Sequence, residues 1–184
     1  MSFRTLATLF LLLAACSQPA LPLDPVYDSD ELSSLSATFN SIAISPASVA
    51  LPGSGSATYS GFFGGNLGAG GSVLGNLGLS ADFGGSSVAG GLSNINVLGV
   101  AGVEDQTLSG DVAFTGWITG TTISALGSGN LTIVDGISQT GTASVTVFGQ
   151  FRDYLGFYDA VSGTIELDAS SIGLTGVSLE FYAQ

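Results

Sequence analysis

Carboxylates are the side chains of this sequence that could carry out acid–base chemistry. The chain has fourteen Asp and Glu residues, no His and only two basic residues. Glu104 and Asp105, with Asp111 close behind, form the densest candidate for such chemistry. A pair of carboxylates can hydrolyse a glycosidic bond, and carboxylates can bind Ca²⁺, although this spacing matches no known calcium loop. The interpretation that we favour is a polar loop between two strands.

Other classes of catalytic site lack the residues that they need. The sequence contains no His and no Lys, and Cys16 is its single cysteine. A Ser-His-Asp or Cys-His arrangement is therefore excluded, as is a phosphate-binding loop with its lysine. Zinc or haem held by His or Cys is excluded as well, and nothing supports haem held by a tyrosine. We expect no enzymatic activity, no cofactor and no metal site.

The first sixteen residues indicate export. Arg4 precedes an apolar run from Leu6 to Ala15 that is too short to span a bilayer, as in a secretory signal peptide. Ala14 and Ala15 followed by Cys16 resemble a bacterial lipobox, in which the cysteine sulfur carries the lipid. A lone cysteine in an exported protein has no internal disulfide partner, which favours lipidation over a reactive thiol. Several acyl chains on one residue give stable membrane anchoring.

The expected location follows from the residue after the cysteine and from the charge. The residue after Cys16 is Ser17 and not an acidic residue. This resembles the signal that sends lipoproteins of Gram-negative bacteria to the outer membrane. The net charge of −12 repels nucleic acid, so we expect no nucleic-acid partner. Because the acids are scattered along the chain, we interpret them as a means of solubility and not as a site for a basic partner.

Four segments follow from composition and periodicity. We expect a signal peptide over 1–15, a lipidated and Pro-rich tether over 16–27, a helix with a linker over 28–55, and a β-domain over 56–184. The helix is expected at about 29–43, with Asp28 as its cap. Its apolar face, which would pack on the domain, consists of Leu32, Leu35, Phe39 and Ile42.

From residue 56 onward the hydrophobic period changes to two, which is typical of strands with one apolar face. Gly-rich and Asp-Gly segments separate these strands; we interpret 64–66 and 127–130 as turns. Short turns without intervening helices predict an all-β, antiparallel, up-and-down barrel of eight strands. The expected strands are roughly 56–63, 75–84, 87–96, 107–118, 121–126, 129–135, 141–152 and 160–168, with 174–183 as a ninth candidate, so that some must merge or split.

The inward phase of the alternation predicts the core. Burial of such side chains stabilises a fold by about 1.5–3 kcal/mol each. The residues expected to point inside are Leu79, Phe83, Val112, Phe114, Val145, Val147, Ile165, Leu167, Val177 and Leu179.

Several segments together resemble the barrel domain of transferrin-binding-protein-B-like surface lipoproteins. The resemblance spans roughly residues 50–184 and rests on LPGSGSATYSG at 51–61, LSADF at 79–83, VAGGL at 88–92, GQF at 149–151 and AVSGTI at 160–165. It implies an eight-stranded barrel on an outer-membrane lipoprotein that captures a host protein or an iron-related ligand. These motifs are signatures of a fold and do not mark an active site.

We therefore expect a lipid-anchored binding protein of the outer membrane, exposed to the periplasm or the cell surface. Its partners would be the membrane, through the lipid, and an unknown protein or small ligand. The alternatives are a membrane-spanning eight-stranded barrel, which needs an apolar outer band and aromatic girdles, and a structural surface lipoprotein.

The loop 153–159 is the candidate ligand surface. Tyr154, Leu155, Phe157 and Tyr158 place four large apolar or aromatic side chains within five residues, where a connection is normally small and polar. Such residues anchor interfaces when they are exposed. The alternative is that the rings plug the barrel mouth or pack on the helix near Phe39. This loop is also where the chain departs from the family that it resembles.

Overall fold

A computed structural model of the protein describes residue 27 and residues 29–67, 70–135 and 137–184. The expected signal peptide, the lipid attachment at Cys16, the tether before Tyr27 and the helix cap at Asp28 lie outside the described residues. Because a lipid anchor would be attached there, lipidation stays a prediction.

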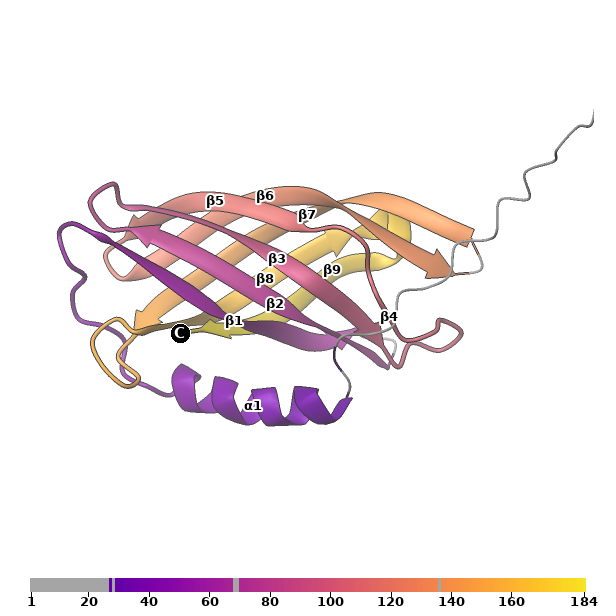
Figure 1. Ribbon diagram of the computed structural model, residues 1–184, viewed down its shortest axis with the longest axis horizontal. Coiled ribbons are helices and arrows are strands. Elements are labelled where there is room, and N and C mark those ends of the chain that lie inside the picture. Colours follow the sequence, from indigo (N-terminus) through magenta and orange to yellow (C-terminus); the bar gives the residue numbers. More distant parts are fainter. Residues whose placement is uncertain (1–26, 28, 68–69, 136) are drawn as a thin grey trace, which may run out of the picture.

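The described chain forms a closed antiparallel β-barrel with one helix on its outside, which confirms the predicted fold class (Figure 1). The helix α1 precedes all the strands, and a 3₁₀-turn η1 lies between the last two. The elements are α1 (Ser29–Ala43), β1 (Ser56–Leu67), β2 (Gly71–Asp82), β3 (Ser87–Leu98), β4 (Gln106–Thr107), β5 (Val112–Thr119), β6 (Thr122–Asp135), β7 (Ile137–Arg152), β8 (Ala160–Ala169), η1 (Ser170–Ile172) and β9 (Leu174–Ala183).

The strands follow one another around the barrel in chain order. Each long strand pairs with the next, β3 with β5 included, while the two-residue β4 pairs with the end of β3. The barrel closes where Gly61–Gly64 of β1 pair with Glu180–Ala183 of β9. Closure gives each of the long strands a neighbouring strand on both sides.

The barrel interior is filled with apolar side chains. All ten residues that the alternation places inside are buried in one cluster, which confirms the predicted phase. Among the largest buried side chains are Phe63, Phe114 and Phe181, which contribute much of the core volume.

Inward-facing glycines make room for these rings. Gly75 is the direct cross-strand partner of Phe63, and Gly90 is the partner of Phe114. A Cβ at Gly75 would lie 2.6 Å from the Phe63 ring, and one at Gly149 would lie 2.8 Å from the Phe181 ring. The glycines are thus part of the core packing, since each gives up its side-chain volume to a neighbouring phenylalanine.

The predictions of turns at 64–66 and 127–130 are wrong, because both segments lie within strands. Residues 64–66 continue β1, and residues 127–130 lie in the middle of β6, so that the expected strands 121–126 and 129–135 are one strand. A Cβ at Gly127 would overlap the Ala113 carbonyl oxygen of β5. This glycine allows two strands to approach closely and does not reverse the chain.

The strand expected over 107–118 is divided. Residues 108–111 interrupt it, which leaves the short β4 and the eight-residue β5. Ser109 still forms an isolated bridge to Thr132 of β6, so the interrupted segment stays beside the barrel wall.

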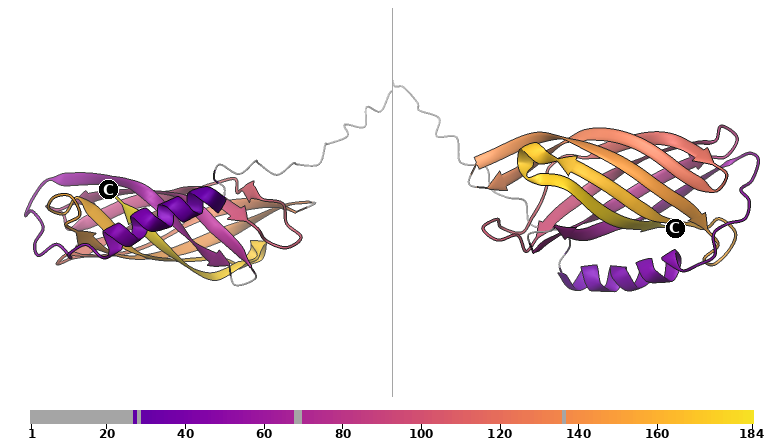
Figure 2. Two further views of the ribbon diagram at one scale, coloured as in Figure 1. Left: turned by 90° about the horizontal axis from the view of Figure 1, so that it is seen from below. Right: turned by 180° about the vertical axis from the view of Figure 1, so that it is seen from behind.

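The helix expected at 29–43 is α1, and it lies along the outside of the barrel (Figure 2). Ile42 is fully buried against Ala160 of β8 and Tyr182 of β9, and Leu35 and Phe39 join the same cluster. The side chain of Leu32 lies outside the description. The helix therefore covers outward-facing apolar residues that would otherwise meet water.

Candidate functional site

The loop between β7 and β8 lies at one end of the barrel, beside the linker that follows α1 (Figure 1). Ala47 of the linker bridges to Arg152 at the end of β7, and the Asp153 N–H donates to the Pro46 carbonyl at 3.0 Å. The Arg152 guanidinium donates to the Ser45 carbonyl at 3.1 Å and to the Ser162 hydroxyl at 3.0 Å. The linker is thus fixed to the base of the loop.

Two carboxylates hold the loop in one conformation. The oxygens of Asp159 accept hydrogen bonds from the Tyr154 and Leu155 N–H groups, both at 2.8 Å. Asp153 accepts from the Tyr158 N–H at 2.8 Å and from the Ser48 hydroxyl at 2.6 Å. The Ser48 and Tyr158 hydrogen bonds lower the pKa of Asp153, because they stabilise its charged form.

Tyr158 plugs the barrel mouth. Its ring is half-buried and lies 5.7 Å from the ring of Phe83, which in turn lies 5.8 Å from that of Phe151. The Tyr59 hydroxyl, inside the barrel, donates to the Tyr158 carbonyl at 2.7 Å. Burial, aided by the nearby Tyr158 and Asp159, raises the pKa of Tyr59 to about 12, so this phenol stays neutral at ordinary pH.

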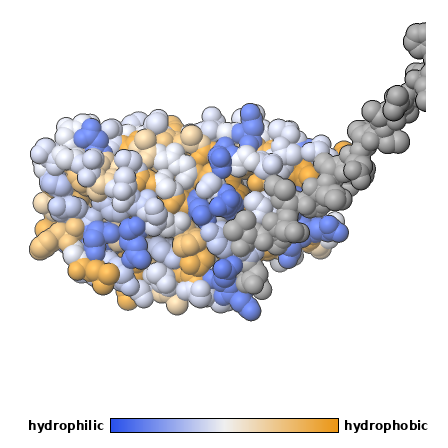
Figure 3. Space-filling view, in the orientation of Figure 1, coloured by the Kyte–Doolittle hydropathy of each residue, from blue (hydrophilic) through white to orange (hydrophobic). Residues whose placement is uncertain are grey.

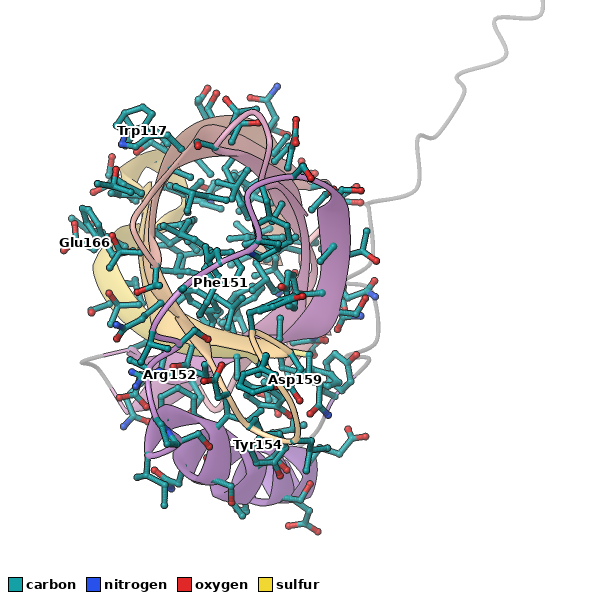
Figure 4. The ribbon with its side chains drawn as sticks, turned by 90° about the vertical axis from the view of Figure 1, so that its left-hand side faces the viewer. Trp117, Phe151, Arg152, Tyr154, Asp159 and Glu166 are labelled. Carbon is teal, nitrogen blue, oxygen red and sulfur yellow. The ribbon has the colours of Figure 1, made fainter. Side chains whose placement is uncertain are left out.

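Tyr154 packs on the outside of the same end. It is half-buried and belongs to the cluster between α1 and the barrel. Figure 4 looks into this end and shows Phe151 inside the ring of strands and Tyr154 over α1. Both alternatives for the rings thus hold, one for each tyrosine: Tyr158 plugs the mouth and Tyr154 packs at the helix.

The other two candidate residues are exposed. Leu155 is 84 % and Phe157 79 % accessible, so the loop presents two large apolar side chains to solvent. We call this pair the loop tip. Figure 3 shows apolar surface at the same end of the molecule. A rigid loop with an apolar tip can contact a partner with little loss of conformational entropy.

Of the acidic candidates, Asp105 has a clear local role. The Asp105 carboxylate accepts a hydrogen bond from the Gly99 N–H at 2.6 Å, which is a contact within its own loop. No group of three or more acidic or cysteine side chains in the described ranges is arranged to hold a metal ion.

A second apolar surface was missed by sequence reasoning. Trp117 and Phe148 both pair with Ser124 on the outer face of the barrel, and Leu126 lies two residues further along β6. All three are about half-exposed, and Figure 4 shows Trp117 projecting outward. The signal was present in the sequence, because these large apolar residues occupy the polar phase of the alternation.

No helix in the described ranges is long and apolar enough to cross a bilayer. No family model matches the chain, and neither the curated proteins nor the solved structures include one that is significantly similar to it.

Proposed function

We propose that this protein is a lipid-anchored binding protein of the bacterial outer membrane, without enzymatic activity, and that the loop tip is its contact surface. The observation that carries the proposal is that Leu155 and Phe157 stand exposed on a loop whose backbone is held by Asp153 and Asp159. Large apolar side chains in a fixed position are typical of binding hot spots.

Packing supports a tethered barrel over a membrane-spanning one. A spanning barrel presents an apolar band to lipid and a polar interior. Here the interior is an apolar core, while the outer row through β6–β9 consists of Leu126, Thr146, Glu166 and Ser178. Figure 4 shows Glu166 on the outside of the wall. A carboxylate in that position favours water over hydrocarbon.

The proposed ligand is a protein or an iron-related molecule, as the resemblance to transferrin-binding-protein-B-like lipoproteins implies. The test is capture of partners by the anchored protein in which Leu155 and Phe157 are both changed to Ser. The matched control changes Leu126 and Phe148 to Ser, since these are the same residue types, 57 % and 49 % exposed on the barrel wall.

We expect the loop variant to lose a partner that the control variant retains. Both variants are expected to keep the melting temperature of the parent protein. Equal retention by both variants would show that the loop tip is not the contact surface. Tyr154 and Tyr158 stay unchanged in this design, because their rings are part of the packing.

Anchoring is tested separately. Mass spectrometry of the mature protein is expected to show an acylated Cys16 at the N-terminus, and Cys16→Ala is expected to move the protein from the outer-membrane fraction to the soluble fraction. A mature chain that begins at another residue without lipid would contradict the anchor. Extraction of the variant only by detergent would favour the spanning barrel.

A further inference from the structure

The two mouths of the barrel differ. At the end near the loop tip, the rings of Tyr59, Phe83, Phe151 and Tyr158 plug the core. A separate cavity of about 400 Å³ at this end lies between Phe83, the linker at residues 49–53 and the turn at residues 118–121. The opposite end, where β1, β3 and β6 finish and β8 turns into β9, is hollow. A cavity of about 340 Å³ opens there. Its aliphatic wall is formed by Leu67, Val100, Val103, Ile133, Ile172 and Leu174.

The residues that line this open mouth indicate which class of ligand it could bind. Among the described residues that line it, none is charged and none is aromatic. Ile133, Ile172 and Leu174 are buried and form the deeper wall, whereas Val100 and Val103 are half-buried at the rim. Aliphatic walls without a flat aromatic face suit a flexible hydrocarbon chain. The polar groups that line the mouth, Gln139 and Ser171, are uncharged.

Charge narrows the class of head group. Glu104 and Asp105 directly follow Val103 in the rim loop. Arg152 is the one basic residue of the described chain, and it lies at the plugged end. A carboxylate or phosphate head would therefore find no cation among the described residues that line the cavity, and the acidic residues that follow Val103 disfavour a negative charge nearby. An uncharged head group, able to accept or donate hydrogen bonds at Gln139 and Ser171, fits the rim.

The rim is held in place before any ligand arrives. The buried side chain of Gln106 donates to the Val134 carbonyl and accepts from the Val134 N–H, both at 2.9 Å, and so takes the place of a strand partner for β6. It also donates to the Glu104 carbonyl at 3.3 Å. Asp105 braces the other side of the loop through Gly99. Pockets for small molecules are usually preformed in this way.

The volume limits the size of the ligand. About 340 Å³ is near the lower end of small-molecule pockets. At about 30 Å³ for each water-sized group, it holds on the order of ten heavy atoms. That is enough for one hydrocarbon chain of medium length and too little for a lipid with several chains.

We propose that the open mouth, opposite the plugged end, binds the aliphatic chain of an uncharged single-chain amphiphile. The site is distinct from the loop tip, and the proposal stands whether or not the loop tip binds a partner.

The test is calorimetric titration of the full chain carrying Cys16→Ala, which keeps acylation of that residue out of the experiment. The probe is 1-decanol below its solubility limit, with decanoate at pH 8 as the charged counterpart. Saturable binding of one decanol per chain, and binding of decanoate about tenfold weaker or more, are expected from the apolar walls and the acidic rim.

Two variants locate the site. Val103→Asp is expected to weaken decanol binding about tenfold or more, because it places a carboxylate in the apolar mouth. Val49→Asp, an identical change at an exposed residue that lines the cavity at the opposite end, is expected to leave binding unchanged. Methyl NMR of the parent protein provides a readout that does not depend on the folding of a variant. Decanol is expected to shift Leu67, Ile172 and Leu174 and not Leu35, which lines the groove beside α1.

Absence of saturation, or methyl shifts centred on the groove beside α1, would overturn the proposal. Equal affinity for decanol and decanoate would overturn the assignment of an uncharged head group.

Discussion

Single carboxylates in this protein hold backbone in place. Asp153, Asp159 and Asp105 each accept main-chain hydrogen bonds within a loop, and two of them brace the residues that flank the loop tip. The candidate binding surface therefore depends on side chains that a partner need not touch.

The contribution of Asp153 to the loop can be measured by titration, because the same hydrogen bonds that hold the loop change its pKa. Its pKa is lowered by the Ser48 hydroxyl and the Tyr158 N–H. A carboxyl with a lower pKa in the folded state stabilises the fold fully above its ordinary value of 3.8, and the contribution is lost as pH falls through the folded pKa. The carboxyl carbon of Asp153, followed by NMR, is expected to titrate below 3.8.

The control for this titration is Ser48→Ala, which removes the larger of the two hydrogen-bond contributions. It is expected to move the pKa of Asp153 back toward its ordinary value and to speed amide exchange at Tyr158. An Asp153 that titrates at its ordinary value in the parent protein would show that these hydrogen bonds do not hold the loop in solution.

The strands place alternate residues on opposite faces, and neighbours on β7 show the consequence. Val147 is fully buried, whereas Thr146 lies on the outer face. Val147→Asp is expected to cost about 4–5 kcal/mol or more and to unfold the barrel, because it buries an unpaired charge. Thr146→Asp is expected to leave the melting temperature nearly unchanged. Equal melting temperatures of the two variants would show that Val147 does not point into the core and that the assignment of the inner and outer faces of β7 is wrong.

Glycines inside the strands are a second feature of the elements. A Cβ at Gly90 would overlap the Phe114 ring and the Gly78 carbonyl oxygen, whereas a Cβ at Gly78 would meet nothing within 4 Å. Gly90→Ala is expected to destabilise the barrel by about 1–3 kcal/mol through overpacking. Gly78→Ala, the matched control, is expected to be neutral or slightly stabilising, because alanine restricts the unfolded chain. Chemical denaturation measures both, and equal effects would contradict the role given to Gly90.

At the scale of the whole molecule, the barrel depends on its two terminal strands meeting. β9 contributes the buried Leu179 and Phe181 and pairs with both β8 and β1. A chain that ends at Gly173 would leave β1 and β8 with open edges and the core open to water. We expect it to lose its cooperative thermal transition and to aggregate, as measured by circular dichroism and size-exclusion chromatography. A monomeric chain with the parent's melting temperature would show that closure is not required.

The same architecture separates the two proposed sites. The loop tip lies at the plugged end, and the aliphatic cavity opens at the other end. Between them lies the packed apolar core of the barrel, through which a ligand cannot pass. Substitutions at the loop tip are therefore expected not to alter decanol binding.

The amino-acid pattern alone determined the secondary structure to a large extent. Strict alternation, as around Val147, specifies which face of a strand is buried, because side chains on a strand alternate with a period of two. The apolar spacing of Leu35, Phe39 and Ile42 likewise specified the helix over 29–43. These patterns are local, so they can be recognised without knowing which strands are neighbours.

Only the tertiary structure decided what depends on neighbours distant in the sequence. From the sequence alone, a glycine such as Gly127 could either form a turn or allow a neighbouring strand to approach closely. The structure shows the second role, because the Ala113 carbonyl oxygen lies where a Cβ of residue 127 would be. Phe157 and Tyr158 are adjacent and alike in sequence. Tyr158 has a φ of 45°, its carbonyl accepts a hydrogen bond from the Tyr59 hydroxyl, and its ring packs against Phe83 in the mouth. The Phe157 side chain is exposed to solvent. The open cavity is likewise made by segments from four different parts of the chain, and such convergence leaves no mark in any one of them.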